Sequence, residues 1–253
     1  MLLAALLLAA AACATPRQAP PRTGTPPPVV QPEPAAWQLP PEAYHTQILF
    51  RASISGAEGE GSLKLTLRLA SPERYQAEAA DALGRVVWGL DVDGDRGLWL
   101  DHRGHTYCRL DGPLDLAFLP LGPLSLSALP PLLLGRLAAP PADPASVSVG
   151  VAPAAAGAAT SAGPPTISYR DAAGRRWSAA LGGAGQVVSW GLWQDESAGP
   201  ILSWVSSGGW AVLSDRRRGV QVRWREVLRE PLRPVAPMSP PGEYREAACT
   251  RSR

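Results

Sequence analysis

Regular alternation of apolar and polar residues is the feature that most restricts what this chain can fold into. In Gly61–Ala70, every second residue from Leu63 to Leu69 is leucine, and the residues between the leucines are Lys, Thr or Arg. Successive side chains of a β-strand point to opposite faces of its sheet. The pattern therefore predicts an antiparallel strand with one buried face.

Further short segments of this kind, separated by turn signals such as Asp-Gly and Gly-Gly, lie on both sides of this strand. They are Tyr44–Ser55, Arg74–Ala80, Arg85–Val92, Gly97–Asp101, Thr106–Leu110, Thr166–Arg170, Arg175–Leu181, Gln186–Gln194, Ile201–Ser206, Gly209–Ser214 and Gly219–Leu228. The sequence predicts a mainly β domain over residues 44–230, in which about a dozen antiparallel strands form one curled sheet.

Three regions depart from the alternation. Ser127–Leu137 combines leucines with Gly135 near its end, which predicts a short apolar helix. Residues 138–165 are rich in Ala, Pro, Gly and Ser without a core-forming pattern, and we interpret them as a mobile insert. Residues 231–253 are Pro-rich and charged, and they are expected to form a flexible tail.

Tryptophan is unusually common, and most of the nine tryptophans fall on predicted strands. Trp190 and Trp193 have opposite parity on one strand, so both of its faces must accommodate a large ring. Two interpretations remain open, since large aromatic residues mostly serve burial. One is a thick core with a Trp-rich outer face, and the other is an apolar ligand cavity.

Four segments of the chain carry recognisable short motifs in a fixed order. They are Glu73–Tyr107 with an Ala-Leu-Gly loop, Leu119–Leu137 with a Leu-Leu-Gly sequence, the hairpin Ile167–Gly183 and the final strand pair Ala211–Leu228. Over about residues 44–228, their order and spacing resemble the LolB family and its relative LolA. LolB is the outer-membrane lipoprotein receptor of the Lol sorting pathway, and LolA is the periplasmic carrier of that pathway.

The resemblance implies an unclosed β-barrel with a short helical lid, enclosing a cavity for acyl chains. Moving a lipid anchor through water costs about 0.8 kcal/mol per methylene, so a protein that accepts one needs an apolar concavity. Strand parity selects the residues expected to line it, which are Leu63, Leu65, Leu67, Val86, Trp88 and Leu90.

The resemblance also implies a role for Leu83, which lies between Asp81 and Gly84 in the Ala-Leu-Gly loop. In the receptor family, this loop carries a protruding leucine that is implicated in delivering cargo to the membrane. The alternative is that Leu83 is a buried turn residue.

The N-terminus has the pattern of an export signal. The residues before Cys13 are apolar without interruption, and they are too few to cross a bilayer as a helix, which needs about 20. Cys13 directly follows small residues and resembles the acylated cysteine of a lipobox. This interpretation makes residues 1–12 a lipoprotein signal peptide and residues 13–43 an acylated cysteine with a Pro-rich linker. The alternative is an ordinary signal with an incidental cysteine.

Ala14, rather than Asp, follows the cysteine, and the resemblance then implies an outer-membrane lipoprotein facing the periplasm. The expected function is to bind acyl chains of lipoproteins or similar amphiphiles and to help insert them into the outer membrane. The expected partners of this monomer are acylated lipoproteins or lipid and a periplasmic LolA-like carrier. The alternative is a structural or envelope-assembly lipoprotein whose barrel is filled by its own side chains.

Two further cysteines, Cys108 and Cys249, would lie in a compartment where disulfides persist. They form either a bridge or two independent thiols, because sequence alone does not give connectivity.

Other classes of function find little support. The net charge of +2 is too small for a main nucleic-acid partner. The sequence lacks a nucleophile elbow, a P-loop and a dinucleotide fingerprint, so neither an enzyme nor a cofactor is expected. His102, His105 and Cys108 lack a fourth ligand, so no metal is expected either. Arg216–Arg218, Arg223 and Arg225 are interpreted as a solvated turn and strand face, with anionic headgroups as the alternative.

Overall fold

The fold is described from a computed structural model. It describes residues 37–57, 59–112, 125–137, 140–151, 164–183, 186–194, 199–234 and 236–248, all of which belong to one compact unit spanning Gln31–Arg253. Cys13 and Cys249 lie outside the described residues.

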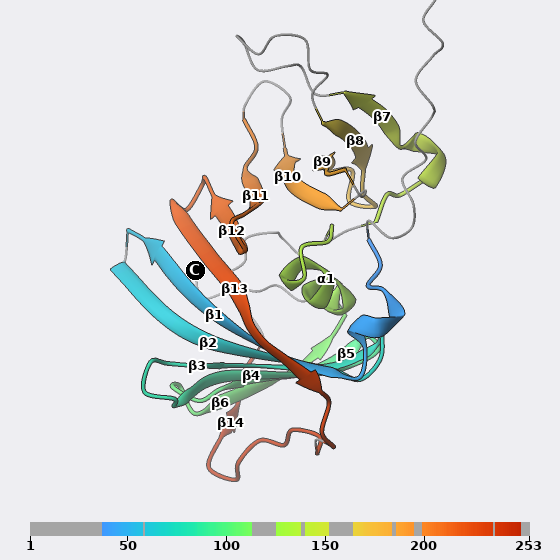
Figure 1. The fold of residues 1–253 in the computed structure, drawn as a ribbon. Helices are drawn as coiled ribbons and strands as arrows, with labels where there is room; N and C mark the ends of the chain where they lie inside the picture. The colour runs from blue at the N-terminus through green and yellow to red at the C-terminus, as the bar shows by residue number, and fades with distance from the viewer. Residues whose placement is uncertain are drawn as a thin grey trace, which may run out of the picture. The chain divides into compact units, whose positions relative to one another are not determined.

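One large antiparallel sheet dominates this unit (Figure 1). Its strands are β1 (Thr46–Gly56), β2 (Gly59–Leu69), β3 (Arg74–Ala80), β4 (Val86–Asp93), β5 (Arg96–Asp101), β6 (Thr106–Asp111), β7 (Ser148–Val151), β8 (Pro165–Arg170), β9 (Arg176–Leu181), β10 (Val187–Trp193), β11 (Leu202–Ser207), β12 (Trp210–Asp215), β13 (Val220–Pro231) and β14 (Arg245–Glu246). The 14 strands follow the order β14-β6-β5-β4-β3-β2-β1-β13-β12-β11-β10-β9-β8-β7. In that order β14 and β7 are the two edges, so the sheet is unclosed.

The predicted fold class is confirmed, because every strand expected from the alternation is present within a few residues. Among the predicted strands, the exception to the hairpin order is the pairing of β1 with β13, which joins the two halves of the chain. Two strands were not predicted. β7 forms within the expected mobile insert and pairs with β8, and β14 forms within the expected flexible tail and runs parallel to β6.

The helical elements are α1 (Leu129–Leu133) and the 3-10 helices η2 (Pro41–Ala43), η3 (Leu126–Ala128) and η4 (Pro144–Ser146). Figure 1 shows α1 on the concave side of the sheet. Gly135 follows the helix with φ of 75°, and a Cβ there would lie 3.1 Å from the Trp204 ring. Glycine is therefore required both by the backbone conformation and by the close approach.

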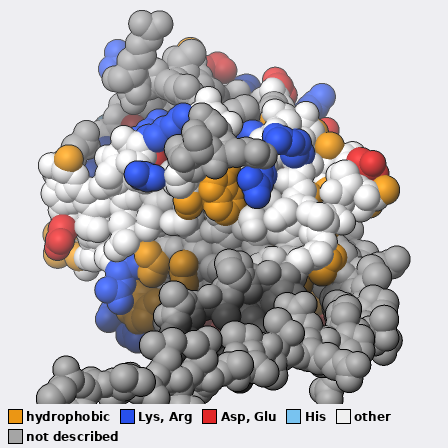
Figure 2. Space-filling view, turned by 90° about the horizontal axis from the view of Figure 1, so that it is seen from above, with side chains coloured by type: hydrophobic (Ala, Val, Ile, Leu, Met, Phe, Trp, Pro, Cys, Tyr) orange, Lys and Arg blue, Asp and Glu red, His pale blue; other side chains and the backbone are white. Residues whose placement is uncertain are grey.

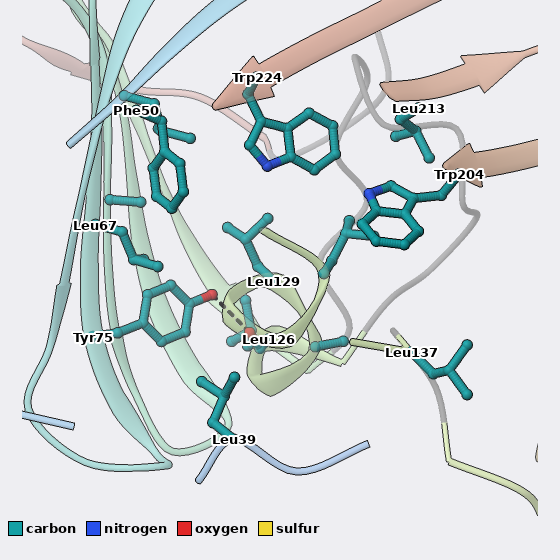
Figure 3. Packing of buried hydrophobic residues seen from close by; sticks show 14 of the residues in the cluster. Leu39, Phe50, Leu67, Tyr75, Leu126, Leu129, Leu137, Trp204, Leu213 and Trp224 are labelled. Carbon is teal, nitrogen blue, oxygen red and sulfur yellow. Dashed lines mark hydrogen bonds between the residues drawn. The ribbon is translucent and has the colours of Figure 1, made fainter. Parts of the chain in front are cut away.

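Hydrogen bonds from the sheet hold α1 and η3 in place. The Tyr75 hydroxyl donates to the carbonyl of Leu126 at 2.6 Å, and the indole nitrogen of Trp224 donates to the carbonyl of Leu133 at 2.9 Å. Burial raises the pKa of Tyr75, so its hydroxyl keeps its proton. Leu129 fills the space between these contacts, as Figure 3 shows. A helix of one turn would be unstable alone, so tertiary contacts maintain it.

The inner face of β8–β11 is covered by an aromatic row. Tyr169, Trp177, Trp190 and Trp204 are all buried, and neighbouring rings lie 5.1–6.4 Å apart. The indole nitrogen of Trp37 donates to the Tyr169 hydroxyl at 3.2 Å. Trp37, which the sequence analysis assigned to the linker 13–43, thus contacts the aromatic row.

The segment after β13 lies against the outer face of β3–β6. The Gln76 amide donates to the carbonyl of Ala236 at 3.0 Å, and the backbone N–H of Met238 donates to Asp91 at 2.7 Å. Asp91 and Gln76 also hydrogen-bond to each other. Residues 236–248, which the sequence analysis assigned to a flexible tail, thus make specific contacts with the sheet. The alternation of apolar and polar residues gave no signal for these contacts, because scattered polar groups make them rather than an apolar face.

Candidate functional site

An apolar cavity of about 480 Å³ lies between α1 and the inner face of β1–β5 and β13. Ligand-binding pockets commonly have volumes of about 300–1,000 Å³, so this one is large enough to bind a ligand. Its lining residues are Ala52, Ile54, Gly61, Ser62, Leu63, Leu65, Ala79, Val87, Trp88, Trp99, Asp101, Arg103, Leu129, Leu132, Leu133, Val222 and Trp224. Only Asp101 and Arg103 among them are charged, and both lie at the β5–β6 turn.

The structure places most of the predicted cavity residues on the inner face of the sheet. Leu63, Leu65 and Trp88 line the cavity. Leu67 and Leu90 are fully buried in the core and do not line it. Figure 3 shows Leu67 directed toward α1, beside Tyr75. Parity therefore identified the correct face, but the position of α1 decides which part of that face stays open.

Val86 was predicted to line the cavity, but its side chain is 39% exposed and does not line it. The register between β3 and β4 shifts from Ala79 opposite Trp88 to Ala80 opposite Val86. This β-bulge adds one residue to β4 and breaks the alternation, so Val87 turns inward. Val87 is 7% exposed and lines the cavity in place of Val86.

Two tryptophans line the cavity although they were not among the lining residues predicted from the sequence. Trp99 on β5 stacks on Trp88 with ring centroids 4.9 Å apart, and Trp224 comes from β13. Trp99 pairs with Leu90 across the β4–β5 hairpin, so the Asp-Gly turn could have placed it on the inner face. The position of Trp224 depends on the β1–β13 pairing, which joins distant segments and leaves no local signal.

The cavity and the Leu83 loop lie at the same end of the sheet. Ala80 at the end of β3 pairs with Lys64, and Trp88 near the start of β4 pairs with Asp101. The β3–β4 loop that contains Leu83 therefore projects beside the β5–β6 turn, where Asp101 and Arg103 line the cavity.

Leu83 is the most exposed large hydrophobic side chain among the described residues, at 79%. Asp81 accepts hydrogen bonds across its loop. One carboxylate oxygen of Asp81 accepts from the N–H groups of Leu83 and Arg85 at 2.9 and 3.0 Å, and the other accepts from the Arg85 guanidinium at 2.8 Å. The Arg85 side chain beside Asp81 lowers the pKa of that carboxyl. Gly84, with φ of 81°, completes the turn.

The β8–β9 hairpin contains the same turn. Residues 171–175 read Asp-Ala-Ala-Gly-Arg, whereas residues 81–85 read Asp-Ala-Leu-Gly-Arg. Asp171 accepts from the N–H groups of Ala173 and Arg175, both at 2.9 Å, and from the Arg175 guanidinium at 2.7 Å. Burial raises the pKa of Asp171, but hydrogen bonds from Trp177 and Arg175 outweigh it and leave the pKa below its usual value.

The second turn shows that the leucine is not needed for the conformation, because Ala173 occupies the same place. The exposed side chain of Leu83 is therefore not required by the conformation of its turn. The five-residue repeat was visible in the sequence, and comparing its two copies could have shown this.

A smaller cavity of about 370 Å³ has Leu133 and Trp224 in common with the first. Its lining mixes aromatic residues such as Trp204 with Arg136 and Arg225. The surface has a similar mixture, since Lys and Arg side chains border exposed hydrophobic ones on the face in Figure 2. Such neighbours occur at membrane-binding surfaces.

Among the residues that the structure describes, no group of His, Cys, Asp or Glu could hold a metal ion. The His102 ring lies 2.7 Å from the Tyr244 hydroxyl, and His105 packs on the same tyrosine. Both histidines therefore contact the C-terminal segment. Cys108 is 8% exposed and disulfide-bonded. None of the helices in the described ranges is both long enough and apolar enough to span a bilayer.

The fold and cavity together define an unclosed antiparallel β-barrel with an internal helix and an apolar pocket. No family model and no curated protein matches the chain. The structure is similar to a LolA superfamily protein from Nitrosomonas europaea, at 7% identity and a TM-score of 0.48, covering 79% of this chain and 90% of that one.

Two further solved structures are similar. One is a putative outer membrane lipoprotein-sorting protein domain from Vibrio parahaemolyticus, at 6% identity and a TM-score of 0.44, covering 73% of this chain and 84% of that one. The other is a DUF1329 family protein from Desulfovibrio piger, at 8% identity and a TM-score of 0.43, with the same coverage.

Proposed function

We propose that this protein binds the acyl chains of lipoproteins or similar amphiphiles in its apolar cavity and helps insert them into the outer membrane. The observation that carries the proposal is the apolar cavity of about 480 Å³. An acyl chain has no polar atoms to satisfy, so a lining of Leu, Ala, Val and Trp side chains suits it. Burial there would recover about 0.8 kcal/mol for each methylene.

The exposed Leu83 beside the cavity supports delivery rather than storage. A leucine that protrudes from a rigid turn can insert into a lipid interface or contact the cargo's chains. The turn at Asp171 forms without it, so the exposed side chain is free for this role. In this proposal the protein acts without catalysis, and a periplasmic carrier of the LolA kind supplies the cargo.

Leu83→Glu is expected to slow transfer of a fluorescent lipopeptide to liposomes by about tenfold. Burying part of one leucine contributes about 1.5 kcal/mol, which the charged variant loses. The melting temperature should stay unchanged, because position 83 is exposed. Ala173→Glu is the matched control at the equivalent turn position, and it should transfer at the wild-type rate. A sharp fall in melting temperature, or a wild-type rate, for Leu83→Glu would refute the role in delivery.

We further propose that Cys13 is acylated and anchors the protein in the outer membrane. Cells labelled with a clickable palmitate should incorporate the label into the wild type and lose it in Cys13→Ser, which should also leave the membrane fraction. Equal labelling and membrane association of the serine variant would contradict the anchor.

A second candidate function is favoured by the aromatic row of β8–β11. Trp177, Trp190 and Trp204 are 0–3% exposed and occupy the inner face of that half of the sheet. Such filling would suit a structural or envelope-assembly lipoprotein that binds no ligand. The two functions differ in whether the cavity next to Trp88 takes up lipid.

A further inference from the structure

A row of like charges crosses the outer face of the sheet. Lys64 on β2 lies directly opposite Arg51 on β1, and Arg51 lies directly opposite Arg225 on β13. Arg223, two residues before Arg225 on β13, lies on the same face of the sheet. We call Lys64, Arg51, Arg225 and Arg223 the basic strip, and all four are exposed.

The basic strip is not compensated by acidic groups. Directly opposite residues in a sheet have Cβ atoms about 5 Å apart, and like charges in such pairs are destabilising. Within the described part of the chain, none of the four forms an ion pair. The nearby carboxylates are already paired, Glu78 with Arg68, Glu226 with Arg229 and Asp81 with Arg85. Folding alone does not account for three cations in register.

Apolar groups lie at both ends of the strip. At one end, Trp210 lies beneath the guanidinium groups of Arg223 and Arg225, 4.1 and 4.8 Å from its ring centroid. At the other end, Ala80 pairs with Lys64 and leads directly into the loop that exposes Leu83. Tryptophan beside cations, together with a protruding leucine, is typical of surfaces that meet lipid headgroups.

We propose that the basic strip binds the headgroups of an anionic phospholipid bilayer, so that this outer face of the sheet lies against the membrane. The pairing across β2, β1 and β13 replaces the interpretation of Arg223 and Arg225 as an ordinary solvated strand face. The charges would attract anionic lipid, while Trp210 and Leu83 enter the interface on either side of them. The ligand of the cavity plays no part in this inference.

The test uses unacylated protein without residues 1–13, which lie outside the compact unit that begins at Gln31. It should float with vesicles of phosphatidylcholine mixed with phosphatidylglycerol, and not with phosphatidylcholine alone. The affinity should fall steeply with added salt. The double variant Arg51→Gln/Lys64→Gln should bind about thirtyfold more weakly, since each basic residue near an anionic surface contributes about fivefold in affinity.

The control is Arg74→Gln/Arg96→Gln, which removes the same charge from exposed positions at the other end of β3 and β5. This variant should bind like the wild type. Equal loss in both variants would show only a general charge effect. No loss in the strip variant would show that other residues bind the vesicles. Either result overturns the proposal.

A stability measurement makes the test independent of vesicles. Relief of like-charge repulsion should raise the melting temperature of Arg51→Gln at low salt, and the difference should vanish at high salt. A lower melting temperature at low salt would show that Arg51 serves the fold, which would contradict the proposal.

Discussion

Filling the cavity with Ala52→Phe is expected to weaken acyl-chain binding about fiftyfold. Ala52 lines the cavity on β1, directly between Leu63 on β2 and Trp224 on β13. A phenyl ring there would occupy space that about three methylenes of a bound chain need, at about 0.8 kcal/mol each. Titration with a fluorescent fatty acid measures the affinity directly.

The fold of Ala52→Phe should survive, because the new ring enters open space instead of a filled core. The matched control is Ala80→Phe, which adds the same ring to the outer face of β3, and it should bind like the wild type. A folded Ala52→Phe protein that binds as tightly as the wild type would show that acyl chains do not occupy this cavity.

Cys108→Ser is expected to lower the free energy of unfolding by about 2–5 kcal/mol. Cys108 is disulfide-bonded on β6, and we propose Cys249 as its partner. Arg245 and Glu246 pair with Thr106 and Tyr107 in parallel register, and the N–H of Ala247 donates to the carbonyl of Tyr107 at 2.8 Å. The backbone thus advances alongside β6 toward Cys108, and a bridge to Cys249 would close a very long loop.

Urea unfolding under non-reducing conditions measures this effect. Cys249→Ser should lose the same stability as Cys108→Ser, and the double variant should lose no more than either. Peptide mapping without reductant should show the two cysteines in one linked fragment. Alkylation of both thiols in the native protein without reductant would refute the bridge.

The strands could be predicted because alternation is a local signal that burial of one face imposes. Leu63, Leu65 and Trp88 were placed correctly for this reason. Val86 was not, because the bulge before Trp88 inserts a residue that composition does not reveal. β7 was missed because a short edge strand needs few apolar residues, and Ser148–Val151 lies in an Ala/Pro-rich tract.

The remaining features of the site depend on contacts between residues far apart in the sequence. The helix at α1 was expected, but no local pattern shows that Trp224 donates to the carbonyl of Leu133 in α1, or Tyr75 to that of Leu126 in η3. The basic strip likewise depends on pairing between β1 and β13, which lie far apart in the chain. Residues such as Arg51 and Arg225 carry no local sign of their juxtaposition.

Native mass spectrometry of the protein after gentle purification tests the central claim most directly, namely that the cavity beside Trp88 holds acyl chains. The account predicts a wild-type mass that includes co-purified lipid or acyl ligand, and loss of that added mass in Ala52→Phe but not in Ala80→Phe. A ligand-free wild-type mass in repeated preparations, with no uptake of added lipopeptide, would contradict the account and favour a barrel filled by its own side chains.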